Sequence, residues 1–339
     1  MTSLRILATL YVVAAAGCSF DASGVTFGDA SHAADAPVGT ADADKGSDAP
    51  PGTPDAKLVD AALPDGDSDG VPDITDNCIL DFNPDQADED SDTVGDVCDN
   101  CPHIPNADQA DIGETTNAQT ADGIGDVCDP RPDQGGDVMV VFDGFNGNTL
   151  DSMWANGPGS GNDSWQLTGN GFLQQPMGDR ESRSFLWGTG ISRAVVDTAF
   201  VVDTIAASTG TGDNSRTVAA VGAWNPLDTT GTGYACMSHM DPENVAAGAN
   251  LLLARYDGTS GATMTEVALP WDMVETGAYF VRAAWNGDAN TQACLTATNG
   301  FSPESVTWDD DGYTVGKGGV RTYGIAARFA YIVIYQLGN

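Results

Sequence analysis

The feature that most constrains this chain is a stretch between residues 65 and 129, where aspartates recur at alternate positions between four cysteines. Twelve residues beginning at Asp65 carry acidic side chains at positions 1, 3, 5, 9 and 12, and a glycine at position 6. This is the ligand spacing of an EF-hand-type calcium loop, whose glycine permits the sharp turn around the ion. Without a cation, such carboxylates repel by about 1 kcal/mol per pair at 4 Å even in water. The predicted ligands of this first loop are Asp65, Asp67, Asp69, the carbonyl of Val71, Asp73 and Asp76.

The spacing recurs twice further along the chain. A second loop has Thr93 at position 6, which makes the turn harder without forbidding it; its predicted ligands are Asp88, Asp90, Asp92, the carbonyl of Val94, Asp96 and Asp99. A third loop keeps only its second half, because an insertion through Glu114 and Thr120 separates it from Asp111 at position 1. Its predicted ligands are Asp122, Ile124, Asp126 and Asp129. We therefore expect two or more calcium ions, with the fuller ligand sets in the first two loops.

The cysteines share this period. Asp-Asn-Cys at 76–78 and at 99–101 each precede a Gly-Asp-Val-Cys-Asp run, with Asn-Pro-Asp-Gln or Asn-Ala-Asp-Gln between them. Four cysteines alone allow three connectivities. In all of these motifs residues 65–132 resemble thrombospondin type 3 repeats. The resemblance implies a calcium-filled, disulfide-stapled rod with almost no hydrophobic core, and the sequential pairs Cys78–Cys98 and Cys101–Cys128.

The alternative for the aspartates is a solvated acidic spacer, which is what acidic runs usually are. A disordered spacer has no reason to keep a 12-residue spacing or paired cysteines, so we favour calcium. Calcium enclosed by so many carboxylates leaves little room for a substrate. Its expected role is structural, because binding to a site absent from the unfolded chain contributes folding free energy.

Charge follows the same segment. The 339 residues have a formal net charge of −36, and residues 19–136 hold 28 acidic against 3 basic side chains. Such a balance argues against nucleic acid as a partner.

The first residues read as an export signal. One arginine precedes a short apolar run at 6–16, which ends in Ala15-Ala16-Gly17-Cys18. This resembles a bacterial lipoprotein signal (1–17), which implies lipidation of Cys18 and a chain anchored in the bacterial outer membrane or on the cell surface. The alternative is an ordinary secretory signal with an incidental cysteine; either way disulfides would persist. Residues 18–64 are rich in Ala, Asp, Pro and Gly, and we expect a disordered tether.

After residue 132, short β-branched and aromatic runs alternate with turn signals, which predicts an all-β sandwich or jelly roll over residues 137–339. No convincing amphipathic helix is present. The predicted strands are 138–142, 164–173, 194–205, 217–224, 233–240, 250–256, 263–269, 279–285, 292–298, 319–323 and 328–336.

The opening run 142–154 and the closing runs 319–324 and 329–335 resemble the end strands of concanavalin A-like lectin/glucanase (laminin G-like) domains. The resemblance implies a carbohydrate-binding or adhesion domain. Ala330 stands where some members place a calcium-ligating aspartate, so we do not expect that calcium site here.

Within 137–339 the two cysteines should pair as Cys236–Cys294 in an exported chain, the alternative being two buried thiols. Among the tryptophans, Trp224, Trp271 and Trp285 are candidates for a sugar-stacking platform, although aromatic side chains more often form sandwich cores. The candidate ligand contacts are Trp224, His239, Arg255 and Trp285.

Catalysis is not expected. The Glu-x-Asp-x-x-Glu strand of glucanases does not occur in 137–339, and neither does a Gly-x-Ser-x-Gly or His-Glu-x-x-His motif. The sequence thus favours a surface lipoprotein whose calcium-stiffened stalk presents a lectin-like domain to polysaccharide or a surface glycoprotein, as in cell adhesion or binding to an extracellular matrix. The alternatives are a glycoside hydrolase with unrecognised carboxylates and a purely structural envelope module.

Overall fold

A computed structural model describes residues 63–157, 165–176, 182–188, 190–207, 216–224, 232–241, 248–257, 260–286, 291–310 and 312–338. The expected signal segment, Cys18 and the tether up to residue 62 lie outside these residues. In the described part of the chain, no helix has the length and apolar character needed to cross a membrane.

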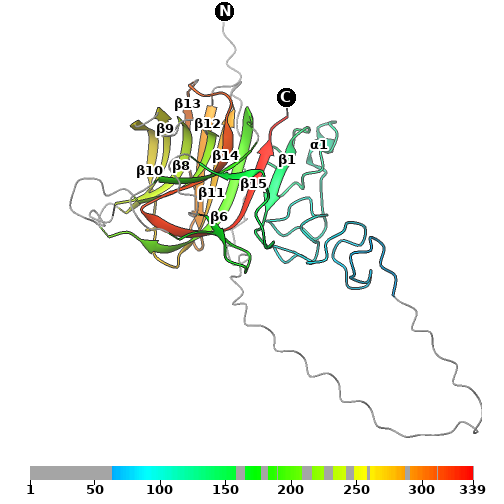
Figure 1. Ribbon diagram of the computed structural model, residues 1–339. Helices are drawn as coiled ribbons and strands as arrows, with labels where there is room; N and C mark the ends of the chain where they lie inside the picture. The colour runs from blue at the N-terminus through cyan, green and yellow to red at the C-terminus, as the bar shows by residue number, and fades with distance from the viewer. Residues whose placement is uncertain are drawn as a thin grey trace, which may run out of the picture.

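Residues from 138 onward form two antiparallel sheets that face each other (Figure 1). The first sheet runs in the order β13 (Glu304–Asp309), β12 (Thr291–Thr298), β11 (Ala278–Asn286), β6 (Arg193–Ile205), β15 (Ile325–Gln336), β4 (Leu173–Gln175) and β3 (Gln166–Leu167), with β1 (Val138–Asp143) also paired to β15. The second runs in the order β10 (Ser260–Ala268), β9 (Ala249–Asp257), β8 (Thr232–Met240), β7 (Arg216–Trp224), β14 (Lys317–Tyr323), β5 (Ser182–Trp187) and β2 (Trp154–Asn156). The predicted all-β sandwich is confirmed.

The main core lies between the sheets. On β6, Val196, Phe200 and Val202 are buried in it, which follows from the two-residue alternation of a strand. The Cys236–Cys294 disulfide joins β8 of one sheet to β12 of the other, so it fixes the two layers together. This predicted pair is confirmed.

Most strand predictions agree with the structure to within three residues. The exception is 164–173, where a turn at Gly169–Gly171 divides the chain into β3 and β4. Strands β2, β5 and β13 were not predicted, because β2 has only three residues and the sequences of β5 and β13 include several polar residues. The helix α1 (Gly113–Thr116) is a single turn within the insertion of the third loop.

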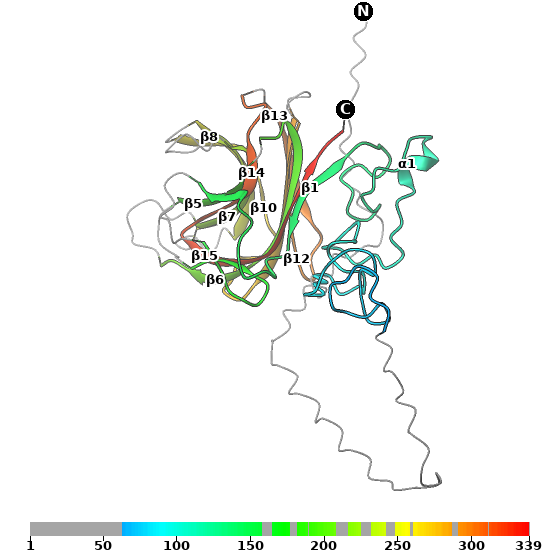
Figure 2. The same ribbon diagram turned by 45° about the vertical axis from the view of Figure 1, so that its right-hand side comes forward.

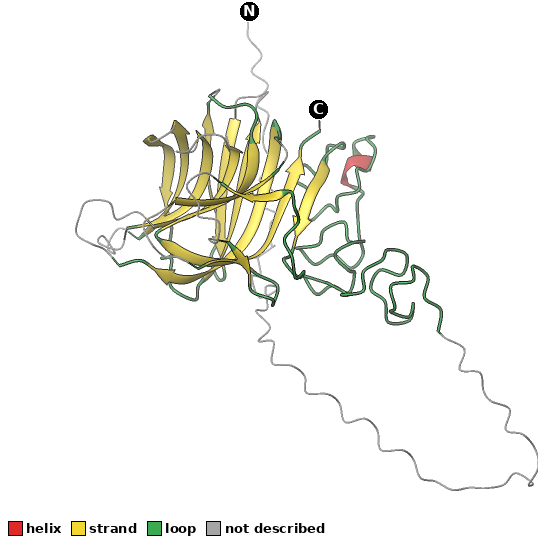
Figure 3. Ribbon diagram, viewed as in Figure 1, coloured by secondary structure: helices red, strands yellow, loops and turns green. Residues whose placement is uncertain are grey.

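The repeats before residue 137 consist of turns and loops around the two predicted disulfides, Cys78–Cys98 and Cys101–Cys128, which are both confirmed (Figure 3). They do not form a free rod. From the second loop onward they lie along the outer face of the first sheet, beside β1 and β15 (Figures 1 and 2). The expectation of a stalk with almost no hydrophobic core is therefore wrong for this part of the repeats.

The reason lies in the outward face of that sheet. Strand β15 buries alternate residues in the sandwich, yet Tyr331, Val333 and Tyr335 on its other face are also buried. They pack in one cluster with Cys101 and Cys128 of the repeats. A strand that is apolar on both faces has to be covered on both, and the repeats supply the second cover.

Candidate calcium loops

The first loop is folded around its own carboxylates. Asp65 accepts hydrogen bonds from the backbone N–H groups of Ser68 (2.7 Å) and Gly70 (3.2 Å), and Asp69 accepts one from Val71 (2.7 Å). Gly70 at position 6 has φ +99°, as the sharp turn requires. The predicted ligands at positions 1, 3 and 5, Asp65, Asp67 and Asp69, each offer an oxygen within 4.8 Å of the others.

The second loop repeats this geometry. Asp88 accepts from the N–H of Thr93 (3.1 Å), Asp92 accepts from Val94 (2.8 Å), and Asp96 at position 9 accepts from Glu89 (2.8 Å). Thr93 adopts φ +83°, so the threonine makes the glycine turn despite its branched side chain. Asp88, Asp90 and Asp92 likewise converge within 4.8 Å.

Several carboxylate oxygens in these loops are buried and have no hydrogen-bond partner in the described part of the chain. They are Oδ2 of Asp67, Asp76 and Asp90. Burial raises the pKa of Asp90 to about 8, and the charges of Asp92 and Asp99 add to the effect. Convergent buried oxygens of this kind are the donors that Ca²⁺ takes, and such a group is costly without a partner. The residues present therefore fit calcium.

Position 12 is held by the repeated Asn-x-Asp-Gln motif. The side-chain N–H of Gln86 donates to Asp76 Oδ1 (2.9 Å), and that of Gln109 donates to Asp99 Oδ1 (2.7 Å). Position 8 of the second loop requires a glycine, because a Cβ on Gly95 would lie only 2.7 Å from the sulfur of Cys78. The recurring motifs thus orient ligands and admit the disulfide.

In the third loop, three of the four predicted ligands have counterparts in the other two. Asp122 accepts from the N–H of Ile124 (3.1 Å), as position 5 does elsewhere. Asp126 accepts from Ile112 (3.0 Å) and Gly113 (2.9 Å), and Asp129 accepts from Arg131 (2.7 Å). The carbonyls of Val71, Val94 and Ile124 remain predicted ligands.

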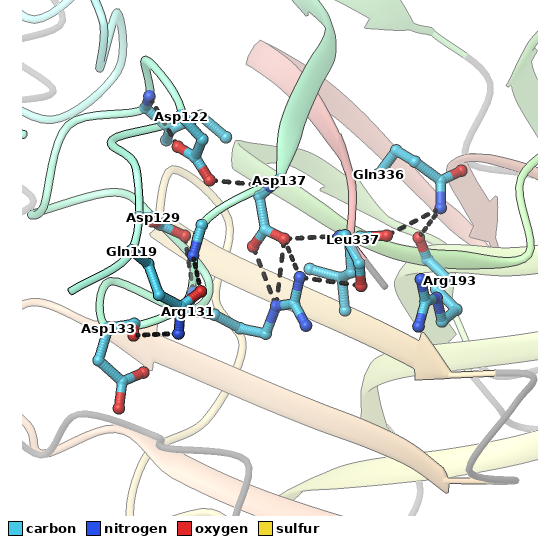
Figure 4. A network of polar contacts seen from close by, with 12 residues as sticks. Gln119, Asp122, Asp129, Arg131, Asp133, Asp137, Arg193, Gln336 and Leu337 are labelled. Carbon is cyan, nitrogen blue, oxygen red and sulfur yellow. Dashed lines mark hydrogen bonds and ion pairs between the residues drawn. The ribbon is translucent and has the colours of Figure 1, made fainter. Parts of the chain in front are cut away.

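This loop also borders the sandwich (Figure 4). Asp122 Oδ2 accepts from the backbone N–H of Asp137 (2.8 Å), just before β1. The Asp137 carboxylate pairs with the guanidinium of Arg131 and accepts from the N–H of Gly338 (2.7 Å). Arg131 also donates to the carbonyl of Gly338 (3.1 Å). The third loop is thereby hydrogen-bonded to the residue that precedes β1, Asp137, and through it and Arg131 to Gly338, which follows β15.

The candidate ligand contacts of the sandwich are not brought together. Trp285 is 2% exposed and packs in the main core, so its ring is not available for stacking, and its assignment as a sugar contact is wrong. His239 and Arg255 lie near opposite ends of the β8–β9 ladder, paired with Asn250 and Tyr234. Arg255 is also engaged by Asp257 and Asp310. Trp224 ends β7, and its side chain is outside the described part of the structure.

A groove of about 420 Å³ lies where the repeats meet the sandwich. Its lining includes Phe82 and Val97, which are both exposed, together with Asp96, Asp143 and Asn146. This groove could not be predicted from the sequence, because its two walls come from the separate segments 82–97 and 142–146. Glu114 was not predicted as a ligand either. It is buried beside the third loop, but it lies in the insertion and so does not fall on the 12-residue spacing.

A profile of the thrombospondin type 3 repeat matches residues 85–109, which contain the second loop. The comparison with curated proteins gave no match. Among solved structures, the chain is similar to the carbohydrate-binding module CBM66 from Bacillus subtilis, with 11% identity and a TM-score of 0.39, over 52% of this chain and 91% of that one. A Lotus tetragonolobus seed lectin gives 9% identity and a TM-score of 0.42, over 59% and 100%. The GH43 BlXynB protein from Bacillus licheniformis gives 16% and 0.42, over 57% of this chain and only 38% of that one. Likenesses this distant are no guide to ligand or activity.

Proposed function

We propose that this protein is an exported, lipid-anchored calcium-binding module whose repeats brace a β-sandwich that binds carbohydrate. The observation that carries the calcium role is the set of buried, unpartnered carboxylate oxygens aimed into the first two loops. Calcium there would fix the turns that place the repeats on the sheet, since its binding free energy adds to folding.

The groove at the junction supports the binding role. Sugar sites combine an aromatic face with a few polar groups that fix orientation, and Phe82 lies here beside Asp96, Asp143 and Asn146. Asp96 also belongs to the second calcium loop, so calcium would hold one wall of the groove in place. The anchor through Cys18 would keep this groove at the bacterial surface.

A glycan array probed with the chain from residue 19 onward, in millimolar calcium and in chelator, tests the binding role. Phe82→Ala removes the exposed ring without touching a calcium ligand. We expect binding that requires calcium and falls at least about tenfold in the variant, as for a lost aromatic contact.

A blank array in calcium would contradict carbohydrate binding, and stable self-association of the same sample would then support a structural envelope module. Release of reducing sugar from a bound glycan would instead support the glycoside hydrolase, which needs two carboxyl groups about 5.5 Å apart or somewhat more.

A further inference from the structure

Glu114 is the most deeply buried acidic side chain of the third loop. It lies on α1 in the insertion, is 0% exposed, and neither of its carboxylate oxygens has a hydrogen-bond partner among the described residues. An isolated carboxylate in such a place is costly. Its surroundings therefore have to supply a proton or a cation.

The neighbours of Glu114 are the other acids of the loop. An oxygen of Glu114 lies within 4.8 Å of oxygens from Asp111 and Asp122, which are positions 1 and 5 of the loop. The corresponding groups of three in the first and second loops are the carboxylates at positions 1, 3 and 5. Glu114 thus stands where position 3 stands elsewhere.

The backbone hydrogen bonds of the third loop match those of the other two loops. The N–H at position 6 bonds to position 1 in all three loops, as Gly70 to Asp65, Thr93 to Asp88 and Gly123 to Asp111. The N–H at position 2 bonds to position 9 in all three, including Ile112 to Asp126. The insertion therefore preserves the backbone hydrogen bonds of the loop. It also supplies a carboxylate from α1, that of Glu114, in the place of the missing carboxylate at position 3.

We propose that Glu114 completes a third divalent-cation site with Asp111, Asp122 and Asp129, and that the site takes calcium. Three of these residues have buried oxygens with no hydrogen-bond partner among the described residues: Asp111 Oδ1, both oxygens of Glu114, and Asp129 Oδ2. An oxygen of Asp122 lies within 4.8 Å of oxygens of Asp111 and Glu114 in one group of acids and within 4.8 Å of an oxygen of Asp129 in another. An all-carboxylate set of hard oxygen donors suits Ca²⁺ and gives no sulfur or imidazole for a softer metal.

The nearby acid Asp137 is not a ligand in this arrangement. Its carboxylate is paired with the guanidinium of Arg131 (Figure 4), and among the described residues no ion pair to the four proposed ligands is seen. Asp137 instead connects the site to the sandwich, because its N–H donates to Asp122 and its carboxylate accepts from Gly338. A cation here would stabilise the contact between the repeats and the first and last residues of the sandwich, Asp137 and Gly338.

This inference rests on the proposed calcium binding by the first two loops, and a count of ions separates the two. Native mass spectrometry of the chain from residue 19 onward, titrated with calcium, gives the number bound; calorimetry gives their affinities. We expect Glu114→Gln to bind one ion fewer than the wild type, or to bind that ion at least about tenfold more weakly. Asp90→Asn should lose a different ion, and Glu266→Gln, an exposed carboxylate on β10, should lose none.

Glu114→Gln is nearly isosteric, and its unfolding in chelator checks that it folds. As a measurement without any variant, crystals soaked in a lanthanide should show anomalous density between Glu114 and Asp111. Wild-type affinity and ion count in Glu114→Gln, or density only in the first two loops, would overturn the third site and leave the proposed function standing. No bound ion in the wild type would overturn both.

Discussion

His103, which lies between the second and third acidic loops, contacts Asp197 of strand β6, with 4.0 Å between His103 Nε2 and Asp197 Oδ2 and both side chains fully buried. Its ring contacts Tyr331 at a centroid distance of 4.9 Å. Asp197 is already paired with Arg282, whose Nε–H donates to it at 2.7 Å. The histidine is therefore an uncharged side chain packed between the repeats and the sheet rather than the partner of an ion pair.

Acid should loosen this contact. Burial, with a smaller effect from Arg282, lowers the pKa of His103 to about 3, whereas a free histidine has a pKa near 6.5. The docked state thus binds fewer protons between these values. Its stability is fully present above about pH 6.5 and should fall by about 1.4 kcal/mol per pH unit below it. The titratable groups around the ring are Asp197, Arg282, Tyr331 and Tyr335, and Phe142 also stacks against it.

Thermal unfolding in saturating calcium at pH 7.0 to 5.0, compared between wild type and His103→Phe, isolates this effect. Phenylalanine fits an aromatic site and does not titrate. The difference between the two proteins should grow as the pH falls; parallel curves would mean that His103 is not buried between the repeats and the sheet.

The acidic loops could be predicted from the sequence, because Asp65–Asp76 carries its whole spacing in twelve residues. The disulfide pairs of the repeats followed from the resemblance to thrombospondin type 3 repeats, because four cysteines alone allow three connectivities. Residues 329–335 are apolar at consecutive positions, which indicates that β15 is buried on both faces. The sequence does not indicate that the repeats are what covers the outer face. Glu114 was missed because its equivalence to position 3 exists only in space. Trp285 was misassigned because a core ring and a sugar platform look alike in sequence.

The left-handed turn at position 6 should favour glycine. Thr93→Gly relieves a branched residue at φ +83° and should stabilise the calcium-loaded second loop by about 1 kcal/mol. Gly70→Thr is the reciprocal control, because no atom lies within 4 Å of a Cβ there, so only the backbone is strained. Calcium affinities from calorimetry should change in opposite directions. A change of the same sign in both would contradict the equivalence of the two turns.

The two repeat disulfides should differ in their effect on docking. Each closes a loop of similar length, worth about 3 to 4 kcal/mol in the chain-entropy model. Cys101 and Cys128 are also buried against the sheet, whereas the Cys78–Cys98 pair is not part of that cluster. Replacing Cys101 and Cys128 by alanine should therefore lower the unfolding temperature more than replacing Cys78 and Cys98. Equal losses in calcium-containing buffer would indicate that the repeats do not pack on the sheet.

The anchor is tested independently of the calcium loops. Cys18→Ser removes the predicted lipidation site and should move the chain from the membrane fraction to the soluble fraction of the bacterial envelope, with calcium binding unchanged. A Ser19→Ala variant should stay with the membrane. Retention of Cys18→Ser in the membrane fraction would mean that the chain is held by another contact.

We propose that the acidic loops bind calcium and thereby hold the repeats on the sandwich. The decisive measurement is isothermal titration of calcium into the chelator-treated chain from residue 19 onward, followed by small-angle scattering of the same sample. We expect at least two bound ions and a radius of gyration that decreases as they bind. No heat of binding, or a radius indifferent to calcium, would contradict it.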